Sequence, residues 1–360
     1  MNRTTTCWLF FATLLAGSRV FAEEPPLAAG GQGACISAGL IYQLEERPTP
    51  QCHASTIVET HSGLVAAWFG GAHEKHPDVG IWLSMEEQGK WMRPVQVVNG
   101  SEGEDKDYAC WNPVLFQPSS GPLMLFYKVG IRPSLWWGAL VTSDDGGNSW
   151  SRPRRLGTSE DLPESNRNLI GPVKNKPIEL EDGTILCPAS TENDGWRVHF
   201  ERTRDRGKTW EVIGPINDAS RFNAIQPSIL RYKDGRMQIL CRSRENTIVQ
   251  SWSHDLGKTW QPITATTLPN PNAGTDAVTL RDGRQLLVYN PTVKGRNVLA
   301  VAVSQDGATW STVLDLERHA AGEFSYPAVI QTTDGNVHVT YTWKRQSIKH
   351  VVLDPKLLRR

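Results

Sequence analysis

Six polar side chains recur at similar places along this chain, one in each of six repeated segments. They are His53, Asn112, Lys176, Gln226, Asp276 and Tyr326. Four of them are followed by proline, which suits the first residue of a strand, where the N–H needs no partner in the sheet. Six unlike polar types make poor packing residues, and polar groups that converge in a concave site usually bind a ligand. The sequence therefore predicts one polar site, built from all six repeats. For Asn112 and Asp276 taken singly, a plain strand start bonded to a neighbouring loop is an equally good interpretation.

The repeated segments read as hairpins, and these would position the polar side chains. Each is a hydrophobic stretch, a turn closed by glycine and a second hydrophobic stretch, with glycines 48 to 62 residues apart at Gly63, Gly121, Gly183, Gly235, Gly283 and Gly335. The last four turns read Asp-Gly, a strong hairpin signal because glycine accepts positive φ. A period near 50 residues is typical of a four-stranded propeller blade. We predict an all-β fold, a single six-bladed β-propeller.

A second motif, Ser/Thr-x-Asp-x-Gly-x-x-Trp, lies between the hairpins. Full copies span residues 143–150, 203–210 and 253–260, with a shortened copy at 304–310 and a degenerate one at 84–91. The aspartate suits a tight turn whose backbone N–H groups it accepts, and the tryptophan would pack under that turn. We expect structural turns between the outer strands of the blades. The last blade has no copy, and we expect a strand from residues 38–44 to complete it and remove the exposed sheet edge.

Charge and composition narrow the classes of partner. The 38 Lys and Arg residues balance the 38 Asp and Glu residues, which gives no electrostatic reason to expect nucleic acid or a membrane surface as partner. No zinc-binding motif appears, so we expect no metal and no cofactor.

The first residues have the pattern of an export signal. Arg3 precedes an apolar run over residues 7–16, and Val20-Phe21-Ala22 has the small-residue pattern of a cleavage site. We therefore expect a signal peptide over residues 1–22, a single domain over residues 23–360, and a periplasmic or extracellular product with no membrane partner after cleavage. Five cysteines remain, an odd number, among which Cys52 and Cys110 form a possible pair.

Taken together, the turns and the polar ring resemble the sialidase (neuraminidase) superfamily, and more closely its secreted BNR-repeat proteins, whose turn motif is the Asp-box. The resemblance implies a propeller whose central site holds three arginines, a tyrosine nucleophile with a glutamate partner, and an aspartate acid/base. Arg242 and Arg296 match the second and third arginines, and Tyr326 matches the tyrosine. The segment 70–78 places Glu74 and Asp78 near the position of the acid/base.

Three of the family's positions differ in this chain. His53 stands in place of the first arginine, and Gln226 stands in place of the glutamate. The glutamate that orients the first arginine in the family is replaced around Thr342. Glutamine cannot accept a proton, and a tyrosine with a pKa near ~10 needs a base or a strong field to act as a nucleophile. The sequence therefore disfavours an ordinary double-displacement sialidase mechanism.

What the resemblance retains is a clamp for a carboxylate. The two guanidinium groups of Arg242 and Arg296 are always charged and form paired hydrogen bonds with planar carboxylates. We therefore expect a glycan with an acidic sugar as the partner, such as a sialic, ulosonic or uronic acid. Trp111, with Trp136 and Trp137, is a candidate platform for a sugar face, while packing between blades is the alternative for each ring.

Three functions follow from these residues. The first is an exported glycoside hydrolase that removes a terminal acidic sugar, with Glu74 or Asp78 as general acid and Tyr326 with His53 at the reacting centre. If Tyr326 is not the nucleophile, a water activated by His53 or Asp276 would give inversion, which requires two carboxyl-class groups about 6.5–9.5 Å apart. The second function is a polysaccharide lyase acting on a uronic acid, with His53 or Tyr326 as base. The third is a carbohydrate-binding propeller without catalysis.

Overall fold

The Asp-Gly turns close hairpins as their residue types require. In the turn at Gly183, φ is 78°, and the Asp182 carboxylate accepts the backbone N–H of Thr184 at 3.0 Å. The turns at Gly235, Gly283 and Gly335 repeat both features. Local bonding of aspartate to its own turn and the conformational freedom of glycine thus fix the register of each hairpin. The predicted hairpins are confirmed.

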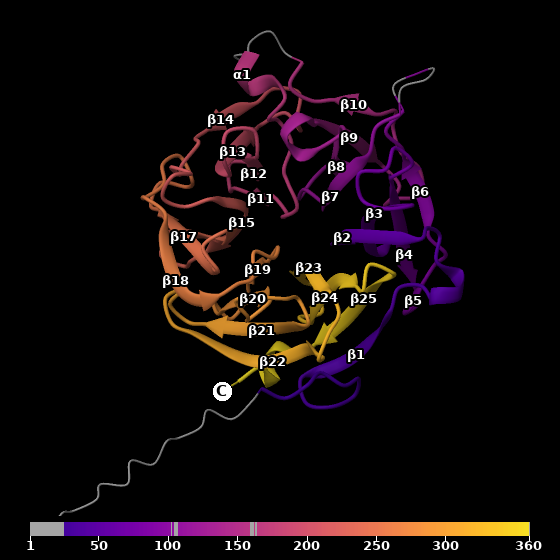
Figure 1. The fold of residues 1–360 in the computed structure, drawn as a ribbon, viewed down its shortest axis with the longest axis vertical. Coiled ribbons are helices and arrows are strands. Elements are labelled where there is room, and N and C mark those ends of the chain that lie inside the picture. Colours follow the sequence, from indigo (N-terminus) through magenta and orange to yellow (C-terminus); the bar gives the residue numbers. More distant parts are fainter. Residues whose placement is uncertain (1–24, 102, 104–106, 159–161, 163, 360) are drawn as a thin grey trace, which may run out of the picture.

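Six antiparallel sheets arranged around a central axis form the blades of a propeller in the computed structural model (Figure 1). The structure describes residues 25–359 except 102, 104–106, 159–161 and 163. The strands of each blade follow from the axis outward. Blade 1 consists of β2 (Gln51–Thr60), β3 (Gly63–Gly71), β4 (Gly80–Glu87) and β5 (Lys90–Trp91), with β6 (Val95–Val98) also paired to β4. Blade 2 consists of β7 (Cys110–Phe116), β8 (Leu123–Val129), β9 (Trp137–Ser143) and β10 (Arg154–Arg155), and blade 3 of β11 (Ile178–Glu179), β12 (Ile185–Thr191), β13 (Arg197–Thr203) and β14 (Glu211–Ile213).

Blades 4 to 6 follow the same order. Blade 4 consists of β15 (Ala224–Arg231), β16 (Met237–Ser243), β17 (Thr247–Ser253) and β18 (Thr264–Pro269). Blade 5 consists of β19 (Asp276–Thr279), β20 (Gln285–Tyr289), β21 (Val298–Ser304) and β22 (Trp310–Arg318). Blade 6 consists of β23 (Phe324–Gln331), β24 (Val337–Trp343), β25 (Ser347–Leu353) and β1 (Cys35–Leu40). The described helical segments are short: α1 (Glu164–Arg167) and the 3₁₀ turns η1 (Leu44–Glu46), η2 (Pro133–Leu135) and η3 (Pro355–Leu357).

The N-terminal strand closes the ring. β1 pairs antiparallel with β25 of the last blade, with Ala38 opposite Val351. We expected this strand over residues 38–44, and it begins and ends a few residues earlier, at Cys35–Leu40. Closure places a strand from the beginning of the chain on the outer edge of the blade formed by its end, which joins the first and last blades.

The outer turns share one set of hydrogen bonds. In the turn over residues 143–150, Asp145 accepts the backbone N–H of Ser149 at 2.8 Å, and the indole of Trp150 donates to the carbonyl of Gly147 at 3.0 Å. Trp210, Trp260 and Trp310 make the same contact in their blades. These turns lie between the third and fourth strands, away from the axis.

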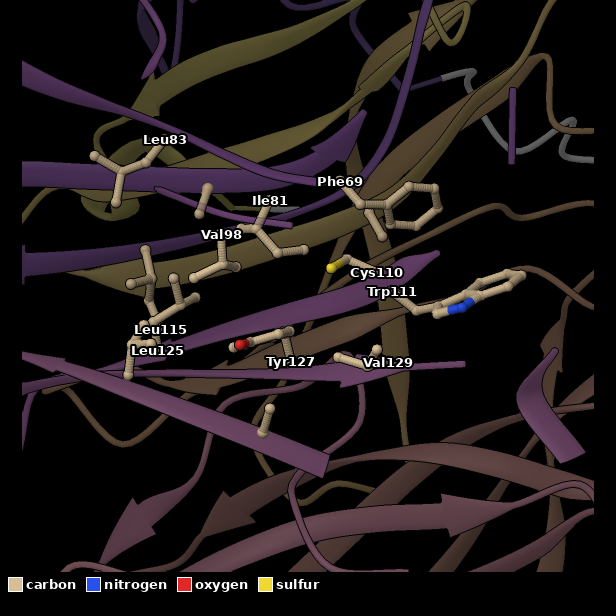
Figure 2. Packing of buried hydrophobic residues seen from close by; sticks show 14 of the residues in the cluster. Phe69, Ile81, Leu83, Val98, Cys110, Trp111, Leu115, Leu125, Tyr127 and Val129 are labelled. Carbon is tan, nitrogen blue, oxygen red and sulfur yellow. The ribbon is translucent and has the colours of Figure 1, made fainter. Parts of the chain in front are cut away.

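Hydrophobic side chains fill the space between neighbouring blades. Figure 2 shows the cluster between blades 1 and 2, where Phe69 and Ile81 face Trp111, Leu115 and Leu125. Each fully buried side chain of this kind contributes roughly 1.5–3 kcal/mol to folding. Because the apolar surface lies between blades, the polar side chains of the inner strands are left to face the axis.

Several sequence expectations concern covalent links and termini. The five cysteines among the described residues are buried and unpaired, so Cys52 and Cys110 do not form the possible disulfide. Instead, the hydroxyl of Tyr42 donates to Cys52 Sγ at 3.1 Å.

The expected signal peptide over residues 1–22 lies outside the described residues. No described helix has the length and apolar character needed to cross a membrane.

Candidate active site

The upper face of the propeller, as defined here, is the end at which the innermost strands begin. Strand pairing brings the start of each inner strand beside the end of the second strand, as in the pairs His53 with Phe69 and Cys110 with Val129. The loops between the second and third strands therefore lie on this face in every blade. They carry Glu74, Trp136, Glu192, Trp196, Arg244, Arg296 and Arg345.

The innermost strands bend where they reach this face. β2, β7, β15 and β23 each carry a bulge near their first residues. The residue at the bend has positive φ in all four, at Ala54 (56°), Asn112 (40°), Gln226 (59°) and Tyr326 (53°). Positive φ is rare outside glycine and is common where a side chain is held at a functional site. The bends direct these positions towards the axis.

The spacing of the bends identifies the equivalent residues of the six blades. Each bend lies nine residues before the hairpin glycine, and the same count gives Lys174, with φ of 70°, in blade 3 and Gly274 in blade 5. A Cβ on Gly274 would lie 3.1–3.3 Å from Lys174, Gln226 and Tyr326, so these positions meet at the axis. The structural ring is therefore Ala54, Asn112, Lys174, Gln226, Gly274 and Tyr326.

Three of the six ring residues expected from sequence thus lie next to the ring. His53 precedes the bend of blade 1 by one residue. Lys176 and Asp276 lie two residues after the ring positions of their blades, where they form an ion pair of 2.8 Å that joins blades 3 and 5. Asp276 is 2% exposed and also accepts the backbone N–H of Val329, so it has no access to a water that attacks substrate.

Lys174, a member of the ring, is the centre of a link between blades. Its ammonium group donates to Asn175 Oδ1 and to the carbonyl oxygens of Thr275 and Pro327, at 2.8, 2.6 and 2.5 Å. Burial lowers the pKa of Lys174 to about 7, although the nearby carboxylate of Asp276 partly offsets that effect. All three ammonium N–H groups are used inside the protein, which makes this lysine a brace between blades 3, 5 and 6.

Arg242 lies beside the tyrosine of the ring. Its guanidinium donates to Tyr326 Oη at 2.6 Å and to Gln226 Oε1 at 3.3 Å. The remaining N–H groups donate to the side-chain and backbone oxygens of Asn272, at 2.7–3.0 Å. Arg242 is buried and, with its five N–H groups engaged, holds Tyr326 and the segment around Asn272 in place.

Arg296, in blade 5, shares one acceptor with Arg242, the backbone oxygen of Asn272. Its Nη2 donates to the backbone oxygen of Asn272 at 3.1 Å, and Nη2 of Arg242 donates to that oxygen at 2.7 Å. One acceptor is thus shared by both arginines of the expected clamp. Any carboxylate that bonded to both guanidinium groups would have to compete with these oxygens of Asn272.

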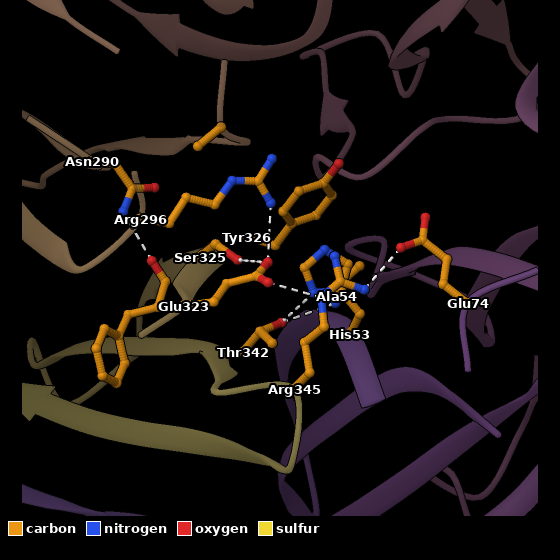
Figure 3. Close-up of polar contacts among 12 residues, drawn as sticks. His53, Ala54, Glu74, Asn290, Arg296, Glu323, Ser325, Tyr326, Thr342 and Arg345 are labelled. Atoms are coloured by element: carbon orange, nitrogen blue, oxygen red, sulfur yellow. Dashed lines mark hydrogen bonds and ion pairs between the residues drawn. The ribbon is translucent and has the colours of Figure 1, made fainter. Parts of the chain in front are cut away.

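A third arginine was not assigned from the sequence. Arg345 lies in the three-residue turn between β24 and β25, and donates to Glu323 Oε2 at 2.9 Å and Glu74 Oε2 at 2.8 Å. Glu323 also accepts from Arg296 at 3.0 Å, so the carboxylate connects two guanidinium groups (Figure 3). Partial burial raises the pKa of Glu323, but the bond and charge of Arg345 and the charge of Arg296 lower it overall.

The conformation of this turn is unusual for its residues. Lys344 and Arg345 both have positive φ, 52° and 56°, in a turn type that strongly favours asparagine and glycine. The ordinary turn signal is therefore missing from the sequence. The turn is strained, and it presents the Arg345 guanidinium to the polar cluster.

His53 occupies the centre of the cationic groups. It is 3% exposed, its ring centre lies 4.2 Å from that of Tyr326, and its Nδ1 lies 3.0 Å from the hydroxyl of Thr342 (Figure 3). Burial, followed by the charges of Arg345, Arg296, Arg242 and Lys174, lowers the pKa of His53 well below its ordinary value. The imidazole is therefore neutral and a weak base. Arg345 supplies a cation beside the position from which the family's first arginine is missing.

The two candidate acids of the first blade differ in their placement. Glu74 faces the cluster through its ion pair with Arg345, whereas Asp78 turns back to accept the backbone N–H of Ala72 at 3.1 Å and pairs with His76 at 2.8 Å. Asp78 therefore stabilises its own loop. Glu74 would have to leave Arg345 before it could donate a proton to a substrate.

Glu192 is a third carboxyl group on the upper face. It is half-buried, accepts the indole N–H of Trp196 at 3.0 Å, and lies in the electrostatic range of Arg242 and Arg244. Both guanidinium groups lie over the ring of Trp196, at 5.0 and 4.3 Å from its centre. Burial raises the pKa of Glu192, and the charge of Arg242 and the bond from Trp196 offset only part of that effect.

Trp111 does not offer a platform to a ligand. The ring is 2% exposed, donates to the carbonyl of Gly130 at 2.8 Å, and packs against Phe69 and Trp136. Asn112 is also buried, at 6% exposure, beside it. The polar cluster thus brings together Arg242, Arg296, Tyr326, Gln226, His53 and Glu74, and it excludes Lys176, Asp276, Asp78 and Trp111.

Comparison with known proteins agrees with this architecture. Residues 62–339 match the model of the BNR repeat-like domain, whereas no curated protein matches the chain by sequence. A protein of unknown function from Dyadobacter fermentans is similar in structure, with a TM-score of 0.70 and 18% identity over 89% of this chain and 98% of that chain.

Two enzymes are similar at the level of fold. A Hadza microbial sialidase has a TM-score of 0.73 and 16% identity over 89% of this chain and 69% of its own. The intramolecular trans-sialidase from Ruminococcus gnavus has a TM-score of 0.73 and 14% identity over 92% of this chain and 100% of its own. These two neighbours show the same fold, and the match of the family model over most of the chain gives the assignment: the chain belongs to the BNR repeat-like domain family.

Proposed function

We propose that this protein binds the carboxylate of a terminal acidic sugar through Arg242, Arg296 and Arg345 and hydrolyses its glycosidic bond. The observation that carries the proposal is the single oxygen of Asn272 that accepts from both Arg242 and Arg296, at 2.7 and 3.1 Å. Two guanidinium groups that reach one acceptor can hold one carboxylate, and charge-assisted bonds of this kind are about twice as strong as neutral ones. Arg345 adds a third cation, joined to Arg296 through Glu323.

Tyr326 is the group that we place at the reacting carbon. Its hydroxyl accepts a 2.6 Å bond from Arg242. In the step that we propose, the Tyr326 oxygen bonds to the anomeric carbon and its proton passes to water, while the glycosidic bond breaks and the leaving oxygen takes a proton from the general acid. A water then displaces Tyr326 and releases the acidic sugar. The residue in the position of the family's glutamate, Gln226, bonds to the same guanidinium and cannot remove the proton. Catalysis by Tyr326 therefore depends on the field of Arg242 rather than on a neighbouring carboxylate.

For the proton donor we propose Glu192. A half-buried carboxyl group held against an indole keeps its proton at a higher pH than usual, which is the state a general acid needs. Glu323 is the contrasting case, because two arginines keep it ionised. Two carboxyl groups with pKa values displaced in opposite directions is the pattern expected when one group donates a proton and the other supports binding.

A binding role without catalysis is supported by one specific observation. Among the described residues, no carboxylate bonds to Tyr326, and Arg242 has all five N–H groups engaged within the protein. A propeller that only binds acidic glycans would show such a site. The lyase alternative needs His53 or Tyr326 as base, and the lowered pKa of His53 makes it a poor one.

Product analysis tests the proposed function. The purified chain would be incubated with glycans capped by sialic, ulosonic or uronic acids, and the products identified by mass. We expect release of the free acid, with one water added, and loss of release in the Arg296→Ala variant. A matched control is Arg204→Ala, since the Arg204 side chain is 76% exposed and far from the cluster. An unsaturated product would identify a lyase, and tight binding with no product would identify a binding protein.

A further inference from the structure

Arg244 differs from the other arginines of the central cluster in what its guanidinium contacts. The N–H groups of Arg242 are all engaged within the protein, and Arg296 and Arg345 both bond to Glu323. Arg244 is exposed, and its guanidinium forms no hydrogen bond or ion pair with the residues that the structure describes. Its five N–H donors are therefore left for a ligand or for water.

The exposed side chain of Arg244 is nevertheless held in place by the indole of Trp196, in the loop between β12 and β13. Its guanidinium carbon lies 4.3 Å from the centre of that ring. The indole is 7% exposed and is itself anchored, because its N–H donates to Glu192 Oε2 at 3.0 Å. A cation over the face of an indole is attracted by the ring without using its N–H groups. Arg244 is thus positioned by a contact that leaves its hydrogen-bond donors unoccupied.

The backbone that carries Arg244 is also fixed. The turn between β16 and β17 is tied to the segments on either side of it: the N–H of Arg244 donates to the carbonyl of Asn223 at 3.0 Å, and the carbonyl of Asn246 accepts the N–H of Asn270 at 3.0 Å. Glu245, the next residue along the chain, accepts the N–H of Asn223 at 3.0 Å and does not pair with Arg244. A group that is already ordered loses less freedom when it binds a ligand.

Arg242 and Arg244 lie against the same indole. Residues two apart on an extended strand point to the same side, and the guanidinium carbon of Arg242 lies 5.0 Å from the centre of the Trp196 ring. The two guanidinium carbons can therefore be no further apart than the sum of their distances to that centre. A carboxylate at Arg242 and a second anion at Arg244 can belong to one small ligand.

Glu192 is the carboxyl group that could compete for Arg244. It lies in the electrostatic range of both Arg242 and Arg244, but it bonds to the indole of Trp196 and to neither guanidinium. Burial raises the pKa of Glu192, which favours its uncharged form. An uncharged Glu192 leaves the positive charge of Arg244 for a ligand.

We propose that Arg244 binds a second anionic group of the ligand, a sulfate ester or a second carboxylate on the glycan that carries the acidic sugar. The proposal rests on the proposed function for the position of the first acid, and it adds a preference for doubly charged glycans. The oxygens of a sulfate or of a carboxylate can accept two parallel bonds from one guanidinium, which a sugar hydroxyl cannot do. Arg244 would then determine specificity, while Arg242 and Arg296 hold the acid at the reacting centre.

Calorimetry on the full chain tests this assignment. Three disaccharides would share the same acidic sugar, and their second sugar would carry a sulfate ester, a carboxylate or neither. At constant ionic strength, we expect the sulfated or the carboxylated ligand to bind about 10-fold more tightly than the singly charged one. The Arg244→Ala variant should lose that gain and keep its affinity for the singly charged ligand. Arg244→Lys, which keeps the charge without the planar guanidinium, should retain part of the gain. Arg132→Ala, at another exposed arginine of the upper face, should retain all of it.

The outcomes separate the two proposals. A gain for one of the two doubly charged ligands supports the role of Arg244 and identifies the anion. Equal affinity for all three ligands, or an unchanged gain in Arg244→Ala, would overturn that role while leaving the acid site intact. If no ligand binds, the proposed function fails, and sodium sulfate is then titrated against the indole N–H signal of Trp196 in an NMR spectrum. A shift that disappears in Arg244→Ala supports an anion site at Arg244, and no shift, or the same shift in the variant, overturns it.

Discussion

The two sides of the upper face differ in how they use charge. On the side of blades 4 to 6, Arg242, Arg296 and Arg345 face the axis and are joined by Glu323 and Asn272. On the side of blades 2 and 3, Lys128 and Glu201 are fully buried, and the pocket lined by residues 133–137, 168–169, 190–191 and 193 has no charged residue in its lining. Charged side chains thus line the candidate site on one side, and on the other side they are buried and bond to backbone groups. The predictions below test that division.

The largest expected effect concerns Glu192, at the boundary between the two sides. The Glu192→Gln variant should retain binding and lose kcat by about 100- to 10,000-fold, the usual contribution of a general acid. Steady-state kinetics across pH would measure it, because loss of the acid should also remove the alkaline limb of the kcat profile. Equal kcat in the variant would assign proton transfer to Glu74 instead.

Removal of Arg345 should weaken the charged side specifically. The Arg345→Ala variant should bind the free acidic sugar about 10- to 100-fold less tightly, since a bond to a charged group contributes about 1.5–3 kcal/mol. Calorimetry with the free acid checks this, with Arg204→Ala as the control that should bind as the unchanged protein does. An equal loss in both variants would show general damage to the fold.

A substitution at Asn272 should strengthen, rather than weaken, binding of the acidic sugar. Its backbone φ is 58°, which glycine accepts, and its side chain holds two N–H groups of Arg242. The Asn272→Gly variant frees these groups and should bind the acidic sugar several-fold more tightly. Weaker binding would mean that Asn272 orients the arginine for the ligand rather than competing with it.

The smallest expected effect is on stability in acid. Burial lowers the pKa of His350 to about 3, and burial also lowers those of His338 and His53. The unfolded chain binds more protons than the folded one between these values and the ordinary value near 6.5, so the free energy of unfolding should fall as pH drops through that window. Thermal unfolding at pH 7.5 and pH 5 should show a Tm lower by several degrees at pH 5. A Tm independent of pH over this window would argue that these histidines are not buried in the neutral form.

The sequence predicted the fold well because the signal was local and repeated. Asp-Gly turns such as Asp182-Gly183 define hairpins through the chemistry of two residues, and six copies define the blades. Counting residues from those turns also located Tyr326, Gln226 and Asn112 at the bends. The same count applied strictly at nine residues gives Lys174 and Gly274, whereas choosing the nearest polar residue gave Lys176 and Asp276, which lie two residues further along the chain.

The rest of the site depends on contacts that leave no local pattern. Arg345 sits in a turn that lacks its usual asparagine and glycine, so neither the turn nor the direction of its side chain was apparent. Asn272 meets both arginines only because three blades converge at the axis. Trp111 resembled a platform by residue type, but burial between blades depends on neighbours that are distant in the chain.

The central claim is that the guanidinium cluster recognises a carboxylate. The most direct measurement compares the affinity of the intact protein for a free acidic sugar with its affinity for the carboxamide of the same sugar, which has nearly the same shape and no charge. We predict that the acid binds at least about 100-fold more tightly, because it alone forms charge-assisted bonds with two or more arginines. Equal affinities for the acid and the amide would contradict the account.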